Sequence, residues 1–144
     1  MITFKVEDFL SPNVIYISPE STLQEALLKM KKHDCGFLPI GDQKNVEGVI
    51  TDRDVIVRAV CDGKDLAREK VKDYMTSPAI SCNVLDGVED AIDKMHAHKI
   101  SRLVVKNSFG TIMGILSFGN LLNKEASAHE VTNIVIHSLR RIVA

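Results

Sequence analysis

The feature that most constrains this chain is an internal repeat at a spacing of 65 residues. Over residues 5–42, nine pairs are identical at this spacing, where chance gives about two. The identical pairs are Lys5/Lys70, Val6/Val71, Asp8/Asp73, Ile15/Ile80, Ala26/Ala91, Lys29/Lys94, Met30/Met95, His33/His98 and Leu38/Leu103. One extra residue in the second copy then shifts the spacing to 66, which aligns Thr51 with Ser117 and Asp54 with Asn120. The chain therefore holds two copies of one supersecondary unit.

Each copy has the hydrophobic pattern of a β-α-β-β-α unit, so the predicted fold class is α+β. In the first copy, a short strand is predicted over Val14 to Ile17, and Thr22 with Glu25 forms a capping box for a helix that ends near His33. Further strands are predicted over 38–40 and 46–50, around a polar turn, and a second helix over Val55 to Val60. The second copy repeats this order. We expect repeat 1 over 1–64, repeat 2 over 65–122 and a C-terminal helix over 123–144.

A unit of about 60 residues buries little core by itself, so the two copies are expected to pack through their sheets as one pseudo-symmetric module. The stretch from Leu121 to Ala144 has no counterpart in the first copy and carries an apolar stripe. This stripe predicts a docking helix, and we expect a homodimer through it together with the helices at Leu23 to Met30 and Val55 to Val60.

Composition excludes several classes of protein. In 144 residues, Lys and Arg number 18 against 19 Asp and Glu, so the net charge of −1 gives no basic field and nucleic acid is not an expected partner. The longest apolar run, Val14 to Ile17, is far below the ~20 residues of a membrane span, and Glu7 and Asp8 do not suit a signal peptide. We therefore expect a cytoplasmic protein without a membrane partner. Three cysteines, at least 21 residues apart, are expected to be reduced thiols.

The motif with the most chemistry is Gly48-Val-Ile-Thr51-x-x-Asp54, where a strand runs directly into a helix. Free backbone N–H groups in the first helical turn suit a phosphate, and a carboxylate can accept two hydrogen bonds from the cis-diol of a ribose. These groups together suit a ribonucleotide. The alternative is purely structural, because Thr51 and Asp54 also have the spacing of a capping box.

The whole repeat resembles the cystathionine-beta-synthase (CBS) domain, whose copies come in pairs called Bateman modules. The resemblance covers residues 3–122. The segments that carry it are Val6-x-Asp8-Phe9-Leu10, Ser18-Pro19-x-x-Thr22, Ala26-x-x-x-Met30, Leu38-Pro39-Ile40 and Gly48-Val-Ile-Thr51-x-x-Asp54. It implies a regulatory module that binds an adenine nucleotide or another adenosyl ligand in a cleft between the copies, of the class of AMP, ADP, ATP, S-adenosylmethionine or NADH, with no required cofactor.

The resemblance also implies site residues. Thr51 would contact phosphate, Asp54 would hold the ribose hydroxyls, and apolar strand residues would face the adenine. The expected wall is Val14, Ile15 and Ile17 with backbone from Gly36, Phe37, Leu38 and Pro39, and the expected second-copy residues are Ile80, Ser101, Arg102, Leu103, Ser117 and Asn120.

Three departures from the family pattern bear on binding. Gly36 stands where many members carry an arginine, and the second copy has Ser101 with Arg102 beside it. Val104 replaces the proline in the second copy, and Asn120 replaces the aspartate. We therefore predict that the two sites differ, with the Thr51/Asp54 site the stronger for a ribonucleotide.

No residue set indicates an enzyme or a metal site. His33 and His98 fall at equivalent helix ends, where a cation meets the helix dipole favourably, and His96 and His98 are spaced i, i+2 on different helix faces. The sequence contains neither G-x-S-x-G nor a Walker-type phosphate loop. Two functions remain: an adenosyl-ligand sensor that signals to an unknown effector protein, or a ligand-free dimerisation or partner-docking module.

Overall fold

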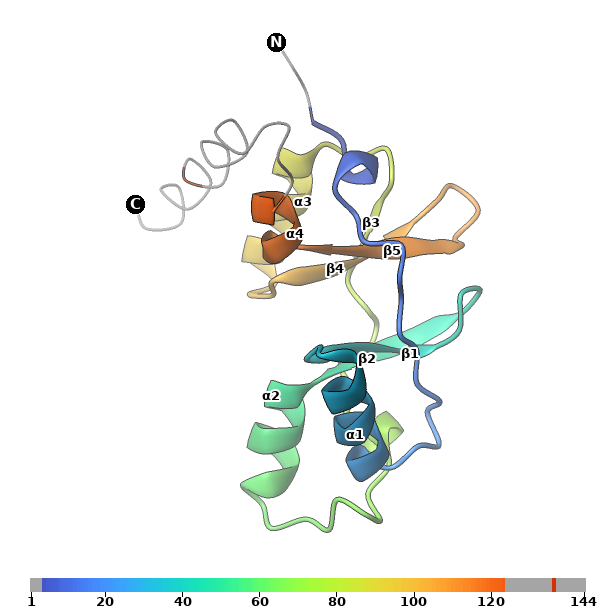
Figure 1. Cartoon of the computed structure of the whole chain (residues 1–144), viewed down its shortest axis with the longest axis vertical. Helices are drawn as coiled ribbons and strands as arrows, with labels where there is room; N and C mark the ends of the chain where they lie inside the picture. Colours follow the sequence, from blue (N-terminus) through green and yellow to red (C-terminus); the bar gives the residue numbers. More distant parts are fainter. Residues whose placement is uncertain (1–3, 124–135, 137–144) are drawn as a thin grey trace. The chain divides into compact units, whose positions relative to one another are not determined.

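The computed structural model describes residues 4–123 and Ile136, and the chain divides into two compact units. Residues 14–79 form the first, here called the Thr51 unit. Residues 4–13 and 80–123 belong to the second, here called the Ser117 unit. Each unit contains one β-hairpin with helices on one of its faces (Figure 1).

The Thr51 unit is built on the antiparallel hairpin of β1 (Phe37–Gly41) and β2 (Val46–Thr51). The helix α1 (Leu23–His33) and the short helix α2 (Asp52–Val55) pack on it, and α2 continues as a π-helical turn over Ile56–Val60. The core consists of Ile17, Leu23, Ala26, Met30, Leu38, Ile40, Ile50, Val55, Ala59 and Val71. The second helix begins directly after Thr51, which caps it as the Thr51/Asp54 spacing predicts, so three residues before Val55 are also helical.

The Ser117 unit contains a three-stranded sheet in the order β3-β4-β5. Strand β3 (Ser81–Asn83) is parallel to β4 (Arg102–Lys106), which pairs antiparallel with β5 (Ile112–Ser117). Helices α3 (Val88–Ala97) and α4 (Phe118–Asn123) complete it. Its core contains Val6, Phe9, Cys82, Val88, Ala91, Ile92, Met95, Leu103, Val105, Leu116 and Leu121. The predicted α+β class is confirmed.

Local sequence signals determine most of these boundaries. The Thr22 hydroxyl accepts a hydrogen bond from the Glu25 N–H at 3.1 Å and starts α1 as predicted, while Asp34 ends it in a left-handed conformation. The two hairpin turns are equivalent: the Asp42 side chain accepts from the N–H groups that follow it, and Asn107 does the same in the second copy. The apolar helix predicted over 123–144 falls almost wholly outside the described residues. Among the residues that are described, no helix is both long and apolar enough to cross a bilayer.

The predicted strand over Val14 to Ile17 is wrong. Only Ile17 forms a bridge, parallel to Ile40, whereas in the second copy the equivalents of Tyr16 and Ile17, Ser81 and Cys82, lie in the regular strand β3. The difference follows from Pro39. In the second copy, the N–H of Val104 donates to the carbonyl of Ile80 at 3.3 Å, but Pro39, which stands in the place of Val104, has no N–H to donate to Ile15.

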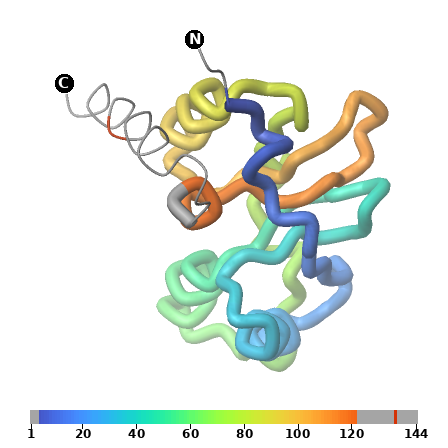
Figure 2. The backbone as a smooth tube through the Cα atoms, turned by 45° about the horizontal axis from the view of Figure 1, so that its top comes forward, coloured from blue at the N-terminus to red at the C-terminus, as the bar shows by residue number. Residues whose placement is uncertain are grey.

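A segment at the start of each copy packs on the core of the other copy (Figure 2). Residues 5–11, here called the N-terminal strap, bind the Ser117 unit through a Lys5–Gly87 bridge and two hydrogen bonds between Ser11 and Ile115. Residues 70–76, the linker strap, bind the Thr51 unit through the equivalent contacts, a Thr22–Lys70 bridge and two hydrogen bonds between Thr76 and Val49. Each strap contributes a fully buried valine of its 3-10 turn, Val6 or Val71, to the core that it joins.

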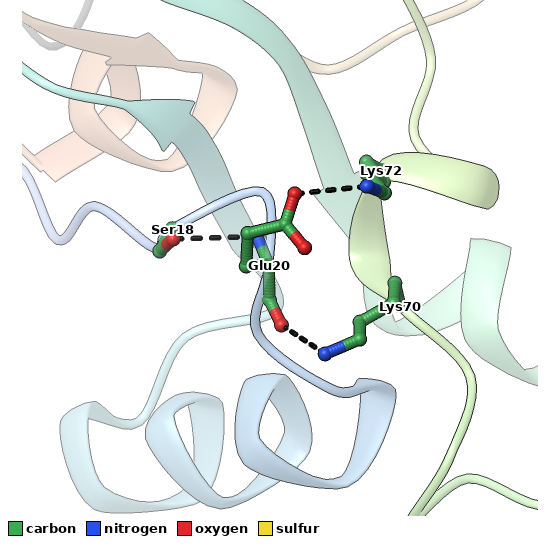
Figure 3. A network of polar contacts seen from close by, with 4 residues as sticks. All are labelled: Ser18, Glu20, Lys70 and Lys72. Atoms are coloured by element: carbon green, nitrogen blue, oxygen red, sulfur yellow. Dashed lines mark hydrogen bonds and ion pairs between the residues drawn. The ribbon is translucent and has the colours of Figure 1, made fainter.

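Polar contacts fasten the linker strap further (Figure 3). The Lys70 Nζ donates to the main-chain carbonyl of Glu20 at 2.9 Å, and the Lys72 Nζ pairs with the Glu20 carboxylate at 2.8 Å. This ion pair lowers the pKa of Glu20 and raises the pKa of Lys72, in each case first through the hydrogen bond and then through the opposite charge. From the other side, Arg58 Nη1 donates to the carbonyl of Tyr74 at 2.5 Å.

Candidate nucleotide site

Thr51 and Asp54 lie at the turn from β2 into α2 and form a complete capping box. The Thr51 Oγ1 accepts from the Asp54 N–H at 3.0 Å, and the Asp54 Oδ2 accepts from the Thr51 N–H at 3.0 Å. Both residues are half-buried. Within residues 4–123 the second oxygen of Asp54, Oδ1, has no hydrogen-bond partner. The structure therefore holds this carboxylate rigidly by one oxygen and leaves the other oxygen able to accept from a ligand.

Gly36 and Phe37 lie beside this turn, where β1 begins at Phe37. The carbonyl of Gly36 accepts from the Asp52 N–H at 3.1 Å, and Phe37 pairs directly with Thr51 in the hairpin register. A Cβ atom placed on Gly36 would lie 2.7 Å from Asp52 Oδ2, so the carboxylate of Asp52 covers Gly36. Asp52 is a residue that the sequence reasoning missed. No signal in the sequence singles it out, because its place depends on the pairing of β1 with β2.

The expected apolar wall divides into buried and partly accessible residues. Ile17 and Leu38 are core residues with 4% and 0% of their surface exposed, and Pro39 is also buried. Val14 and Ile15 are half-buried. In the part of the chain that the structure describes, the main-chain N–H and carbonyl of Ile15 have no partner, and the carbonyl lacks one because Pro39 has no N–H to donate to it.

Ile15 lies close to the capping box along the sheet. The parallel Ile17–Ile40 bridge aligns this segment with β1, so Ile15 lies in register with Leu38, the residue after the partner of Thr51. The Thr51 unit therefore has an acceptor carboxylate and an unpaired backbone segment near the same end of β1.

The equivalent turn of the Ser117 unit keeps only half of the capping box. The Ser117 Oγ accepts from the Asn120 N–H at 3.1 Å, but Asn120 does not return a hydrogen bond to the Ser117 N–H. Its Nδ2 donates instead to the carbonyl of Ile115 at 3.4 Å. The carbonyl of Ser101 accepts from the Phe118 N–H at 3.3 Å, as Gly36 does from Asp52. The hydroxyl cap and the backbone hydrogen bond of the turn are therefore repeated in the second copy, but the carboxylate is not.

The other expected residues of the second copy differ in exposure. Leu103 is fully buried in the core, and Ile80 packs against that core with its carbonyl bonded to Val104. Ser101 and Arg102 are exposed, and Arg102 pairs directly with Ser117 in the β4–β5 register. The main-chain carbonyl that is unpaired at Ile15 is therefore hydrogen-bonded at Ile80.

The histidines and cysteines form no cluster in the described chain, where no group of three or more His, Cys, Asp or Glu side chains could hold a metal ion. His33 is the last residue of α1, and His98 is the C-cap residue of α3, as their spacing predicts. Cys82 lies in the core of the Ser117 unit, where burial raises the pKa of its thiol to about 11. Cys61 is exposed.

Comparison with known proteins identifies the class of protein that this fold and these turns define. The sequence model of the CBS domain matches residues 6–60 and 71–127, and the chain belongs to the CBS domain family. The CBS domain-containing protein YhcV of Bacillus subtilis is 32% identical over 133 residues, which are 90% of this chain and 94% of YhcV.

Two solved structures share the fold of this chain. The CBS domain protein PAE2072 from Pyrobaculum aerophilum, solved in complex with AMP, matches with a TM-score of 0.78 and 26% identity, over 90% of this chain and 99% of that one. The CBS domain pair of protein MJ0100, solved with 5′-methylthioadenosine and S-adenosyl-L-methionine, matches with a TM-score of 0.74 and 26% identity, over 83% and 94% of the two chains.

Proposed function

We propose that this protein is a regulatory module that binds an adenosyl ligand and passes the signal to an effector protein. The observation that carries the proposal is the carboxylate of Asp54, half-buried, fixed by the Thr51 N–H and with one oxygen free of partners among the described residues. A carboxylate in this state can accept hydrogen bonds from the two hydroxyls of a ribose. The complexes of PAE2072 with AMP and of MJ0100 with adenosyl compounds support the same ligand class.

The unpaired main-chain N–H and carbonyl of Ile15 are the proposed contacts for the base. Adenine carries an exocyclic amine, which donates, next to a ring nitrogen, which accepts. The carbonyl and N–H of Ile15 offer the matching acceptor and donor, and the partly buried side chains of Val14 and Ile15 supply apolar contact. The Thr51 unit is proposed as the stronger half-site, because in the Ser117 unit the carboxylate is replaced by Asn120 and the carbonyl of Ile80 is already bonded.

A ligand screen followed by calorimetry tests this function. We expect AMP, ADP, ATP, S-adenosylmethionine or NADH to stabilise the purified protein by about 2.7 kcal/mol at 100 times its Kd. With the best ligand, Asp54→Ala should weaken binding about 5-fold to 100-fold more than Asn120→Ala, since hydrogen bonds to charged groups are worth roughly 1.5–3 kcal/mol against about 0.5–1.5 for neutral pairs. No stabilisation by any ligand of the panel, with no ligand co-purified, would contradict the proposal.

The second candidate function, a docking module, has its own supporting observation. Four large apolar side chains of α1 and of the α2 extension are exposed in the Thr51 unit: Leu28 at 59%, Ile56 at 54%, Val57 at 49% and Val60 at 50%. We propose that these helices form the interface of a homodimer, since exposed apolar residues in one region mark interaction surfaces. Sedimentation should show a dimer at tens of micromolar and a monomer for the double variant Ile56→Lys/Val60→Lys. A parent protein that sediments as a monomer would contradict this.

A catalytic role is not part of the proposal. Catalysis needs an acid, base or nucleophile placed by more than a capping box, and the proposed role of Asp54 is to accept hydrogen bonds from a ribose. We also propose a cytoplasmic location, as the sequence predicts.

A further inference from the structure

Up to residue 123, the Ser117 unit exposes three large apolar side chains: Leu85 at 57%, Phe109 at 93% and Met113 at 41%. All three lie at one end of the sheet, where β4 ends at Lys106. Phe109 is in the turn from β4 to β5, Met113 is the second residue of β5, and the N–H of Val84, next to Leu85, donates to the Lys106 carbonyl at 2.9 Å. This end, here called the hairpin end, points away from α3 and α4, which therefore do not cover it (Figure 1).

The outer edge of β5 is incompletely covered at the hairpin end. In the described chain, the N-terminal strap pairs with β5 only at Ile115. At the equivalent edge of the Thr51 unit, the hydroxyl of Ser77 donates to the main-chain carbonyl of Glu47 at 2.7 Å. Pro12 stands in the place of Ser77 and has neither a hydroxyl nor an N–H, so the carbonyl of Met113 lacks this donor.

The other hairpin carries charges at the same positions. Its turn contains Lys44, where the longer second turn contains Phe109, and Glu47 has the place of Met113. Charged side chains, lysine above all, commonly protect the edge of a sheet from pairing with another chain. Residues 107–123 contain no charged side chain at all. The hairpin end of the Ser117 unit therefore lacks the protection that the hairpin of the Thr51 unit has.

The absence of charge suits a second copy of the chain as the partner of this surface. Two copies related by a two-fold axis place each residue near the axis against its own equivalent in the other copy. A charged side chain at that place would meet a like charge, which opposes binding, whereas Phe109 and Met113 would meet apolar side chains. Methionine and aromatic side chains are also enriched at the buried centre of protein interfaces. The hairpin end thus meets the condition that contact with itself imposes.

We propose that the hairpin end of the Ser117 unit is a second contact between copies of this chain, in which the β5 edges of two copies meet about a two-fold axis. Phe109 and Met113 form its apolar centre, and the carbonyl of Met113 is available to a donor of the other copy. A hairpin end buries less than the roughly 1,200–2,000 Å² of a standard interface, so this contact is weaker than the proposed helix interface. With both contacts, dimers associate into tetramers at high protein concentration.

Sedimentation of the full chain over a range of concentrations tests this contact. Between about 20 and about 500 µM, a range suited to a small interface, we expect the parent protein to change from dimer to tetramer. The double variant Phe109→Lys/Met113→Glu gives this hairpin the charges of the other one and should remain a dimer. Pro12→Ser supplies the missing donor within the chain and should weaken the tetramer about 3-fold. The three substituted side chains are exposed, so the variants should fold.

Two controls separate this contact from the helix interface and from a general effect of charge. Ile56→Lys/Val60→Lys removes the proposed helix interface and should change from monomer to dimer over the same range. Lys44→Glu/Glu47→Lys exchanges the two charges of the Thr51 hairpin and should associate as the parent does.

Two results would overturn the proposal. A parent protein that gains no mass up to the highest concentration would exclude a second copy and leave the hairpin end for a different protein. A tetramer that persists in the double variant of Phe109 and Met113 would place the contact on another surface. Neither result affects the adenosyl-binding function, which the ligand screen tests separately.

Discussion

The Thr51 unit and the Ser117 unit share a scaffold but differ in which backbone and side-chain groups the scaffold leaves unpaired. In both units the carbonyl of the residue before the first hairpin strand accepts from the N–H of the residue after the capping residue. In both units a lysine of the first helix also bonds to a carbonyl of the segment before that helix. That lysine is Lys29, bonded to the Tyr16 carbonyl at 2.6 Å, or Lys94, bonded to the Ser81 carbonyl at 2.9 Å. Pro39 against Val104 and Asp54 against Asn120 then decide which groups are left for a ligand. The two units therefore have similar packing, and differences at single residues change the groups that a ligand could contact.

The largest expected effect tests whether each strap packs on the core of the other copy. Phe9→Ala should destabilise the Ser117 unit by about 3–5 kcal/mol, because the ring is only 3% exposed in that core and leaves a cavity there. Hydrogen exchange should then speed up in α3 (Val88–Ala97) well before it does in α1 (Leu23–His33). The matched variant Tyr74→Ala, at the equivalent place in the linker strap, should affect α1 first and by less, since Tyr74 is only partly buried. If Phe9→Ala instead lost protection first in α1, the N-terminal strap would not be part of the core of the Ser117 unit.

The next effect concerns the equivalent residues Pro39 and Val104, which determine whether the first hairpin strand can donate to the parallel segment beside it. Val104→Pro should destabilise the Ser117 unit by about 3 kcal/mol, because it removes the N–H that bonds the Ile80 carbonyl in a central strand. Pro39→Val should instead supply the missing donor to Ile15 and extend the Ile17–Ile40 bridge toward a strand. Binding of the best adenosyl ligand should then weaken about 3-fold to 10-fold, since a neutral hydrogen bond of about 0.5–1.5 kcal/mol has to be displaced. Chemical denaturation measures the stabilities of both variants. If Pro39→Val bound the ligand as tightly as the parent, Ile15 would not contribute to the site.

These two predictions also mark what the sequence could and could not reveal. The hairpins, the Thr22 and Thr51 caps and the equivalence of the copies follow from turn residues and hydrophobic spacing, which act locally. The packing of each strap on the other copy does not follow, because residues 5–8 and 70–73 carry the same Lys-Val-x-Asp pattern, which does not indicate the core that each strap joins. The absent strand at Val14 to Ile17 depends on a donor that is missing 24 residues away, at Pro39, and Asp52 reaches Gly36 only once β1 and β2 pair.

A smaller effect is a difference in reactivity between Cys61, in the Thr51 unit, and Cys82, in the Ser117 unit. The alkylating reagent iodoacetamide should modify Cys61 rapidly at pH 8 and leave Cys82 unmodified, because Cys61 is exposed whereas Cys82 is buried with a thiol pKa raised to about 11. The raised pKa also sets a pH dependence. The folded state favours the protonated thiol, so this contribution to stability is complete below the unfolded thiol pKa of about 8.5 and is lost as the pH rises toward 11. Mass spectrometry of labelled peptides distinguishes the sites, and modification of Cys82 as fast as Cys61 in the folded protein would contradict its place in the core.

The smallest expected effect is at the ion pair between Glu20 and Lys72, which fastens the linker strap but has no counterpart in the N-terminal strap. In the second copy, Leu85 occupies the place of Glu20, and Glu7 occupies the place of Lys72 in the other strap. The side chains of Lys72 and Glu20 are 43% and 65% exposed, so water and salt screen their attraction. Lys72→Ala should therefore leave the thermal midpoint unchanged within error, with any small loss at low salt disappearing in 1 M salt. The matched variant Val71→Ala should lower the midpoint clearly, because Val71 is fully buried. A Lys72→Ala variant as damaging as Val71→Ala would show that charge, and not the buried valine, holds the strap on the Thr51 unit.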